Sequence, residues 1–133
     1  MKRILLAFDG TEAALKALDM AATFATTFGA TITVVSVVPV RSLRATIDPW
    51  DDRAVHATEL RLAARLLGER GVTFDLLEPV GDVPRTIERI AGEGDYDIIV
   101  VGSRGLGPVE RVLQGSVSEH LATHAPTTVV VAR

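Results

Sequence analysis

Short runs of consecutive apolar residues, rich in β-branched types, recur along the chain and constrain its fold more than any other feature. Strands of a parallel sheet carry such unbroken runs, because helices cover both faces of the sheet. Segments with apolar residues at helical spacing separate the runs. The runs are residues 3–8, 31–38, 72–77, 98–101 and 127–132. We therefore expect an α/β fold, an open five-stranded parallel sheet with helices on both faces and right-handed crossovers.

The helices between the runs have recognisable ends. Thr11 is a typical N-cap, and Gly29 and Gly71 are typical C-terminal stops. Asp82 followed by Pro84 indicates another helix start, and Gly92 and Gly94 are expected to end that helix. The helical side chains expected to face the core are Leu15, Leu18, Ala22, Ala25, Val55, Leu62, Leu66, Leu67, Ile87, Ile90, Ala91, Val117, Leu121 and Ala122.

Length and composition exclude several classes of protein. The 133 residues fit a single domain, 1–133. No apolar run approaches the ~18 residues of a membrane helix, and Asp9 ends the first run too early for a signal peptide, so we expect a cytoplasmic protein without a membrane partner. The absence of cysteine excludes disulfides and thiol catalysis. A net charge of −3 without a basic stripe speaks against nucleic-acid binding.

The order of the strands decides where a ligand would bind, because open parallel sheets bind ligands where the winding reverses. Order 3-2-1-4-5 places this crevice between the first and fourth strands, and order 2-1-3-4-5 places it between the first and third. The sequence alone does not decide. The only elaborate loop follows the fourth run, and the third ends in a plain Glu78-Pro79, which favours the first order.

That elaborate loop has the spacing Gly102-x2-Gly105-x9-Gly115-Ser116. Gly102 is expected to leave the strand at an unusual φ and bring the backbone close to a ligand. Gly115 leaves no side chain between a ligand and the first amides of the next helix, which have no intrahelical acceptors and suit a phosphate. The Ser116 hydroxyl is a further donor, with Ser118 close behind. The loop is neither a Walker A motif, since no Gly-Lys-Ser/Thr follows, nor a G-x-G-x-x-G fingerprint.

Together with other short motifs, this spacing resembles the ATP-binding branch of the universal stress protein family. The other motifs are Asp9 after the first run, Gly-Ser-Val-Ser-Glu-His at 115–120, His-Ala-Pro at 124–126 and the terminal valines 129–131. The resemblance covers the chain from Lys2 to Arg133. It implies the strand order 3-2-1-4-5 and ATP as the ligand.

The resemblance also implies roles for single residues. The Asp9 carboxylate would accept from a ribose hydroxyl or from the adenine amino group, although Asp9 also reads simply as a helix-start residue. The backbone of Val37 would contact the adenine edge, and residues 7–9, beginning with Ala7, would line the base pocket. Mg²⁺, the helix N-terminus and Arg104 or Arg111 would balance the phosphate charge. The phosphate-side residues expected are Gly102, Arg104, Gly105, Gly115, Ser116, Val117 and Ser118.

The fifth run predicts a homodimer. Residues 127–132 are apolar, no helix follows them, and no charge or proline blunts the edge of the sheet. An edge of this kind pairs with a second copy, and the family resemblance implies the same dimer.

Two functions remain open from the sequence. The first is a dimeric ATP-binding regulator of the stress response that passes its nucleotide state to an unknown protein partner. The second is an enzyme with weak ATPase or autophosphorylating activity, with Ser116 or Ser118 as acceptor. A phosphoacceptor receiver domain is excluded, because a single Asp ends the first run, no Asp ends the third and no Lys follows the fifth.

The remaining polar residues carry weaker signals. His120 and His124 lie one helical turn apart, but no third ligand is evident, so we expect no metal site, and His124 suits a helix end. Asp95 and Asp97 read as a solvated entry to the fourth strand. The long connection before Asp51 reads either as a surface loop anchored by Trp50 or as a flap over the ligand.

Overall fold

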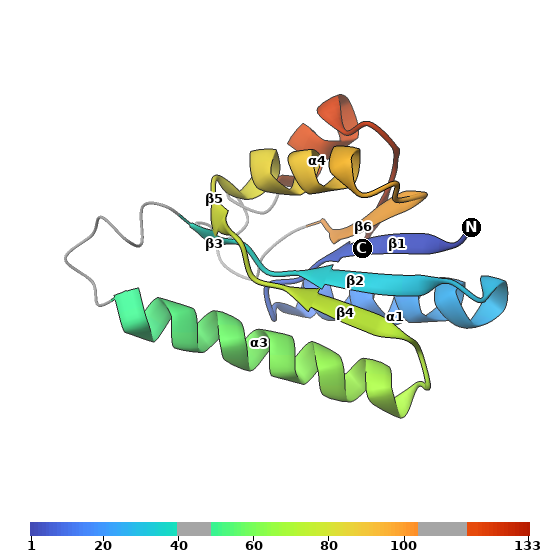
Figure 1. Ribbon diagram of the computed structural model, residues 1–133, viewed down its shortest axis with the longest axis horizontal. Helices are drawn as coiled ribbons and strands as arrows, with labels where there is room; N and C mark the ends of the chain where they lie inside the picture. The colour runs from blue at the N-terminus through green and yellow to red at the C-terminus, as the bar shows by residue number, and fades with distance from the viewer. Residues whose placement is uncertain (40–48, 104–116) are drawn as a thin grey trace.

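The computed structural model describes residues 1–39, 49–103 and 117–133, and for residues 49–54 only the backbone. Its main sheet has five strands in the order β4-β2-β1-β6-β7, and all of its pairs are parallel. This order confirms the predicted order 3-2-1-4-5 (Figure 1). The strands are β1 (Arg3–Ala7), β2 (Thr31–Val35), β4 (Phe74–Leu77), β6 (Ile98–Gly102) and β7 (Thr128–Ala132).

Helices lie on both faces of the sheet. Helices α1 (Glu12–Phe28) and α3 (Pro49–Glu69) cover one face. Helix α4 (Val83–Glu93) and the last helix, described over residues 117–124, cover the other (Figure 1). Among the described residues, none of these helices combines the length and apolarity needed to cross a bilayer.

The strands are apolar throughout because they divide their side chains between two cores. Ile4 and Leu6 of β1 pack in the cluster that α1 and α3 contribute to. Leu5 and Ala7 pack in the cluster of α4 and the last helix. Alternation along a strand sends successive side chains to opposite faces, and both faces are covered. Full burial of an aliphatic side chain contributes about 1.5–3 kcal/mol, so both clusters hold the sheet between its helices.

The predicted helix ends are largely confirmed. The Thr11 hydroxyl accepts from the Ala14 N–H at 3.2 Å, and Gly29 ends α1 with φ 70°. The Asp82 carboxylate caps α4 by accepting from the Arg85 N–H at 3.3 Å. The prediction for Gly92 is wrong, because α4 continues to Glu93 and Gly94 is its C-cap.

The second apolar run does not form one strand, as we expected for residues 31–38. β2 ends at Val35, and Val38–Pro39 form a separate short strand, β3, paired with β5 (Val80–Gly81). The Val38 N–H donates to the Pro79 carbonyl at 2.8 Å. The supposedly plain segment after β4 therefore continues into a second small sheet beside the carboxyl ends of the main strands.

Two side chains predicted to face the core are exposed instead. Val55 is 52% exposed on α3, and Ala122 is exposed on the last helix although its neighbour Leu121 is fully buried. Adjacent helical residues point about 100° apart, so a helix that buries Leu121 turns Ala122 toward solvent.

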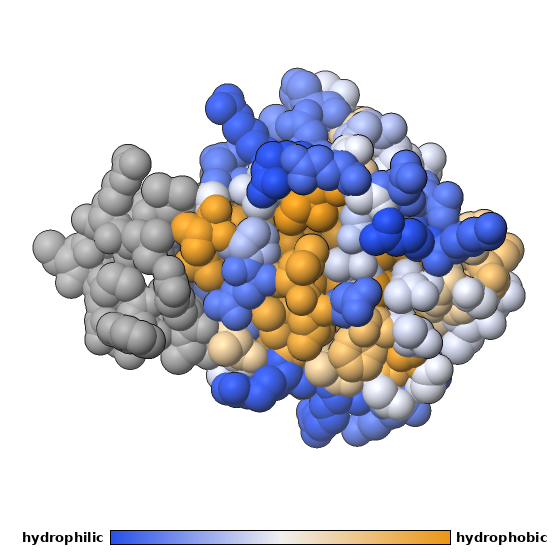
Figure 2. Space-filling view, viewed as in Figure 1, coloured by the Kyte–Doolittle hydropathy of each residue, from blue (hydrophilic) through white to orange (hydrophobic). Residues whose placement is uncertain are grey.

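The edge of the sheet formed by β4 also carries apolar surface. Leu76 and Leu77 of β4 and Val80 of β5 are each more than a third exposed. Figure 2 shows the corresponding hydrophobic surface over β4 and β5. Both edge strands of the main sheet, β4 and β7, thus present apolar residues.

Asp97 is exposed directly before β6, as expected, and it also has a structural role. Its Oδ2 accepts from the backbone N–H groups of Lys2, at 2.6 Å, and Arg3, at 2.9 Å. These two hydrogen bonds, the one from Lys2 foremost, hold the pKa of the Asp97 carboxyl below its ordinary value. The carboxylate therefore joins the start of β1 to the start of β6.

Candidate functional site

A cavity of about 490 Å³ lies at the carboxyl ends of the central strands. Its walls come from the ends of β1, β2 and β6, from the start of α4 and from the last helix. β1 has β2 on one side and β6 on the other, which is where the winding of the sheet reverses. This is the position at which open parallel sheets bind ligands.

The cavity brings together five of the residues predicted from the sequence. Ala7, Asp9, Val37, Gly102 and Val117 all line it, although they come from four separate parts of the chain. The lining is mainly apolar, as is usual for small-molecule sites. Its polar side chains are those of Asp9, Thr11, Ser36, His56 and Asp82.

Of the other predicted residues, only Ser118 belongs to the part of the chain that the structure describes. Ser118 is 6% exposed and is not among the residues lining the cavity. Arg104, Gly105, Gly115 and Ser116 lie outside the described residues.

Gly102 lines the cavity for a different reason than predicted. Among the described residues, the glycines with positive φ are Gly10, Gly29 and Gly71, so the expected unusual φ at Gly102 is wrong. A Cβ atom at Gly102 would lie 2.6 Å from the backbone carbon of Ala13 and 2.7 Å from its oxygen. Glycine is required because the first turn of α1 packs directly on the end of β6.

Asp9 has a helix-start role and also lies in the wall of the cavity. Its Oδ1 accepts from the Thr11 N–H at 3.1 Å and from the Thr11 hydroxyl at 2.6 Å. It thereby orients the N-cap of α1, which is a helix-start role. The same side chain lines the cavity, so a structural role does not remove it from the site.

A cluster that the sequence analysis missed lies where β2 leaves the sheet. Ser36 Oγ is 2.7 Å from His56 Nδ1, and Glu59 Oε2 is 3.2 Å from the same nitrogen. The Ser36 hydroxyl also donates to Glu59 Oε2 at 3.4 Å. The (i, i+3) spacing of His56 and Glu59 shows that they share a helix face. No local sequence pattern indicates that Ser36 contacts His56 and Glu59.

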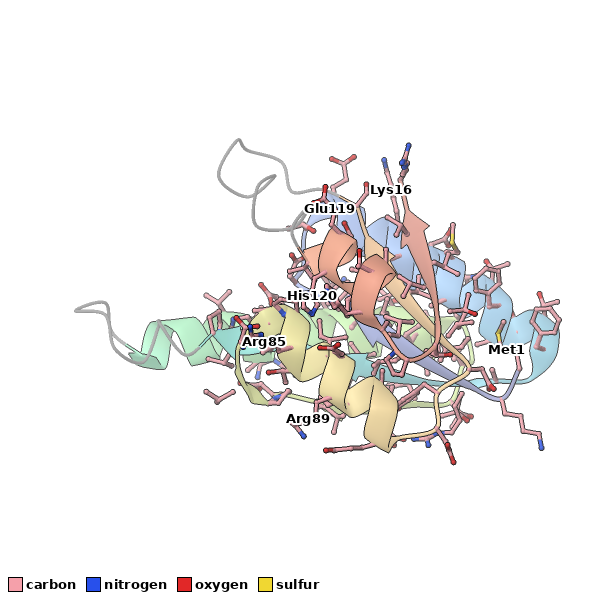
Figure 3. All side chains as sticks on the ribbon, turned by 90° about the horizontal axis from the view of Figure 1, so that it is seen from above. Met1, Lys16, Arg85, Arg89, Glu119 and His120 are labelled. Carbon is pink, nitrogen blue, oxygen red and sulfur yellow. The ribbon has the colours of Figure 1, made fainter. Side chains whose placement is uncertain are left out.

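His120 of the last helix contacts α4, and His124 contacts His120 within the same helix. His120 Nε2 is 3.3 Å from Glu88 Oε2 of α4, and Figure 3 shows His120 on the side of the last helix toward α4. His124 Nδ1 is 3.1 Å from the His120 carbonyl, and the two rings stack at 4.4 Å. Within the described part of the chain, no group of three or more His, Cys, Asp or Glu side chains is arranged to hold a metal ion.

The topology and the cavity at its switch point define a Rossmann-like α/β protein. A sequence model of the universal stress protein family matches residues 1–133. The chain is also 32% identical over 143 residues to a putative universal stress protein of Staphylococcus epidermidis, across 99% of this chain and 84% of that protein. The chain therefore belongs to the universal stress protein family.

Solved structures of family members share the fold. A universal stress protein from Archaeoglobus fulgidus in complex with dAMP has a TM-score of 0.79 at 22% identity, covering 100% of this chain and 98% of that chain. A family protein from Arabidopsis thaliana with AMP bound has a TM-score of 0.75 at 19% identity, covering 99% and 91%. At these identities the likeness establishes the fold.

Proposed function

We propose that this protein binds an adenine nucleotide, ATP before others, in the cavity between β1, β2 and β6, and acts as a regulator in the stress response. The observation that carries the proposal is the convergence of Ala7, Asp9, Val37, Gly102 and Val117 on one cavity at the switch point. The complexes of two structural relatives with dAMP and AMP support an adenine ligand.

Different sides of the cavity would bind different parts of the nucleotide. The base and ribose would occupy the side near β1 and β2, with the Val37 backbone along the adenine edge and Asp9 accepting from a ribose hydroxyl or the amino group. The phosphates would extend past Gly102 toward Gly105, Gly115 and Ser116 in the loop before the last helix. Backbone amides at a helix start, Mg²⁺ and a nearby arginine such as Arg104 would supply the opposing charge.

A binding role fits the described cavity better than rapid hydrolysis. In the described part of the cavity, the Ser36 hydroxyl lies beside the His56 imidazole, and the Glu59 carboxylate contacts the same ring. A serine, a histidine and a carboxylate are also the members of a catalytic triad. In a triad the serine and the carboxylate use different ring nitrogens. Here both Ser36 Oγ and Glu59 Oε2 contact Nδ1, so the arrangement does not relay a proton through the ring.

Titration calorimetry of ATP into nucleotide-free protein, with and without Mg²⁺, tests the proposal. We expect saturable binding that is lost in Gly115→Val, whose side chain would stand between the phosphates and the helix amides. Ser116→Ala should only weaken binding, since a hydrogen bond to a charged group contributes about 1.5–3 kcal/mol. An absence of heat and of saturation in demonstrably nucleotide-free protein would refute ATP binding.

The alternative function is weak ATPase or autophosphorylating activity. The rate of phosphate release distinguishes it from binding alone. If wild-type protein releases phosphate no faster than Gly115→Val, binding alone remains. Release well above that variant would instead establish turnover.

A further inference from the structure

Helix α4 supplies an apolar part of the cavity wall that the site residues predicted from the sequence do not explain. Val83 and Ile87 of α4 line the cavity, and both pack in the core between the sheet, α4 and the last helix. They are four residues apart, so they lie one turn apart on the same face of the helix. Ala7 and Val35, which end β1 and β2, line the same cavity and belong to the same core. The wall of Val83 and Ile87 therefore faces the carboxyl ends of these strands.

Burial increases along this face of α4 from its first turn inward. The N-cap Asp82 lines the cavity, and Val83 directly after it is half-buried. Ile87, one turn further along, is 2% exposed. A flat ring that enters between α4 and the strand ends would therefore contact Val83 first and Ile87 behind it. Such contact removes apolar surface from water on both sides, which favours binding.

Two short strands hold the first turn of α4 in place. β3 pairs with β5, and Figure 1 shows this pair beside the start of α4. A Cβ atom at Gly81 of β5 would overlap Oγ1 of Thr86, which is buried in α4. Glycine is required here because β5 packs directly on the helix. The apolar wall is thus formed before a ligand binds, and preformed sites avoid the cost of ordering on binding.

The same pair of short strands links this wall to the proposed base contact at Val37. Val37 directly precedes β3, and Val83 follows β5 after one residue. β3 and β5 continue from β2 and β4, on one side of β1, whereas Gly102 ends β6 on the other side. An apolar wall also offers nothing to balance a phosphate charge, which is costly to remove from water without a partner. The position and the chemistry of the wall both suit the base.

We propose that Val83 and Ile87 are ligand-contacting residues that bind the aromatic base of the nucleotide by apolar contact. Gly81 is a positioning residue, because its lack of a side chain lets β5 hold the first turn of α4 at the cavity. The inference rests on the proposed function, since it names contacts within the same site. The part of the ligand that fits this wall is a flat, uncharged ring.

The first test compares ATP and adenosine binding by calorimetry in wild type, Val83→Ala, Ile87→Val and Ile90→Val. Ile87→Val and Ile90→Val remove one methylene group from the same helix, and Ile90 packs in the same core but is not among the residues lining the cavity. A buried methylene group corresponds to about a 4-fold change in affinity. We expect Ile87→Val to weaken both ligands about 2- to 4-fold and Val83→Ala, which removes two carbons, about 4- to 15-fold. Ile90→Val should bind both as wild type does.

A rescue experiment tests the positioning role of Gly81. Gly81→Ala should weaken ATP and adenosine by the same factor, because the new methyl group displaces the first turn of α4. Thr86→Ala removes the overlapping oxygen and leaves the Thr86 Cβ position 3.6 Å from the new methyl group, an ordinary contact. The double variant of Gly81→Ala and Thr86→Ala should therefore regain affinity relative to Gly81→Ala alone. Failure of this rescue would show that Gly81 does not act through Thr86.

Methyl spectra of wild-type protein saturated with ATP give a second readout that a purely structural role would not move. The base protons should show nuclear Overhauser contacts to the methyl groups of Val83 and Ile87, and the ring current of the base should shift these methyl signals. Ile90 is the internal control and should show no such contact.

The outcomes separate this inference from the proposed function. If wild type binds ATP but Val83→Ala and Ile87→Val bind it equally well, or Ile90→Val weakens it as much as Ile87→Val, the assignment is wrong and nucleotide binding stands. Absence of the Overhauser contacts at saturation also overturns the assignment. If wild type binds neither ATP nor adenosine, the proposed function fails and these contacts with it. The spectra use wild-type protein, so they decide the question even if a variant fails to fold.

Discussion

At the scale of single residues, the Asp97 carboxylate shows how one side chain ties together segments distant in sequence. It accepts from the N–H groups of Lys2 and Arg3, and these hydrogen bonds lower its pKa from 3.8. A carboxyl whose pKa is lower in the folded than in the unfolded chain stabilises the fold while it is ionised. This contribution is complete above the unfolded pKa and is lost as the pH falls through the folded pKa.

We therefore predict that Asp97→Asn lowers the free energy of unfolding at neutral pH, because the neutral amide is a weaker acceptor. The difference from wild type should shrink as the pH falls below about 4, where the aspartate of wild type becomes protonated. Urea unfolding of both proteins across this pH range measures the difference in the free energy of unfolding. A difference that stays constant down to the lowest pH would show that the charge of Asp97 is irrelevant.

Only some of the cavity residues could be predicted from the sequence. Asp9 and Gly102 were predictable, because each directly follows an apolar run at the ligand end of the sheet. The reason for glycine at 102 was not, because the clash with Ala13 arises only when α1 docks on β6. Ser36, His56 and Glu59 were missed for a similar reason, since no local pattern places a residue after β2 beside the buried face of α3.

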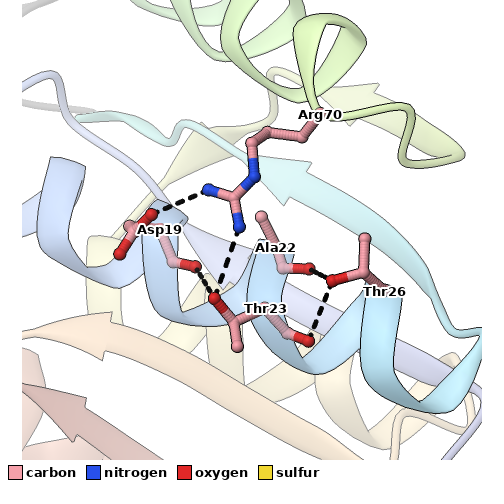
Figure 4. A network of polar contacts seen from close by, with 5 residues as sticks. All are labelled: Asp19, Ala22, Thr23, Thr26 and Arg70. Atoms are coloured by element: carbon pink, nitrogen blue, oxygen red, sulfur yellow. Dashed lines mark hydrogen bonds and ion pairs between the residues drawn. The ribbon is translucent and has the colours of Figure 1, made fainter.

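At the scale of elements, two kinds of contact join α1 to the end of α3. Arg70 reaches Asp19 Oδ1 at 2.7 Å and the Thr23 hydroxyl at 3.3 Å, and Figure 4 shows this network with the Thr26 hydroxyl beside it. The side chains of Arg70 and Asp19 are 37% and 74% exposed. One turn earlier, Leu67 is fully buried in the core between the helices and the sheet.

Burial of Leu67 should stabilise this junction more than the ion pair between Arg70 and Asp19 does. We predict that Arg70→Ala lowers the free energy of unfolding by less than about 1 kcal/mol, as for other exposed ion pairs. Leu67→Ala should lower it by about 2–5 kcal/mol, because the lost methyl groups leave a cavity. Urea unfolding compares the two directly. Equal losses in both variants would contradict this ranking.

The elements themselves were largely predictable, and their ends were less so. The apolar runs marked all five strands of the main sheet because a doubly covered strand leaves little room for polar residues. The run 31–38 gave no sign that the chain leaves the sheet after Val35, since Val37 and Val38 are buried elsewhere. Apolar composition reports burial, and it does not report which sheet a residue pairs with.

At the scale of the whole molecule, the edge strand β7 supports the proposed homodimer. The Ala132 carbonyl accepts from Ser103 and so points toward β6. Successive residues of a strand direct their backbone groups to opposite sides, so Val129 and Val131 direct theirs outward. Apolar side chains and outward N–H groups together suit pairing with a second copy.

We predict that the protein has twice the chain mass of 14.2 kDa by light scattering at micromolar concentration. Val129→Pro removes one outward N–H without removing a hydrogen bond to β6, and it should yield a monomer with an unchanged circular dichroism spectrum. Val129→Ala, which keeps the N–H, is the matched control and should remain a dimer. A monomeric wild type would show that there is no dimer. A dimeric Val129→Pro would show that the interface lies elsewhere.

A crystal structure of the protein grown with ATP and Mg²⁺ would show directly whether the cavity binds the nucleotide. We predict nucleotide density in the cavity at the carboxyl ends of β1, β2 and β6, with the base beside Val37, the ribose near Asp9, and the phosphates past Gly102. Nucleotide density outside this cavity, or an empty cavity in crystals grown with saturating ATP, would contradict it.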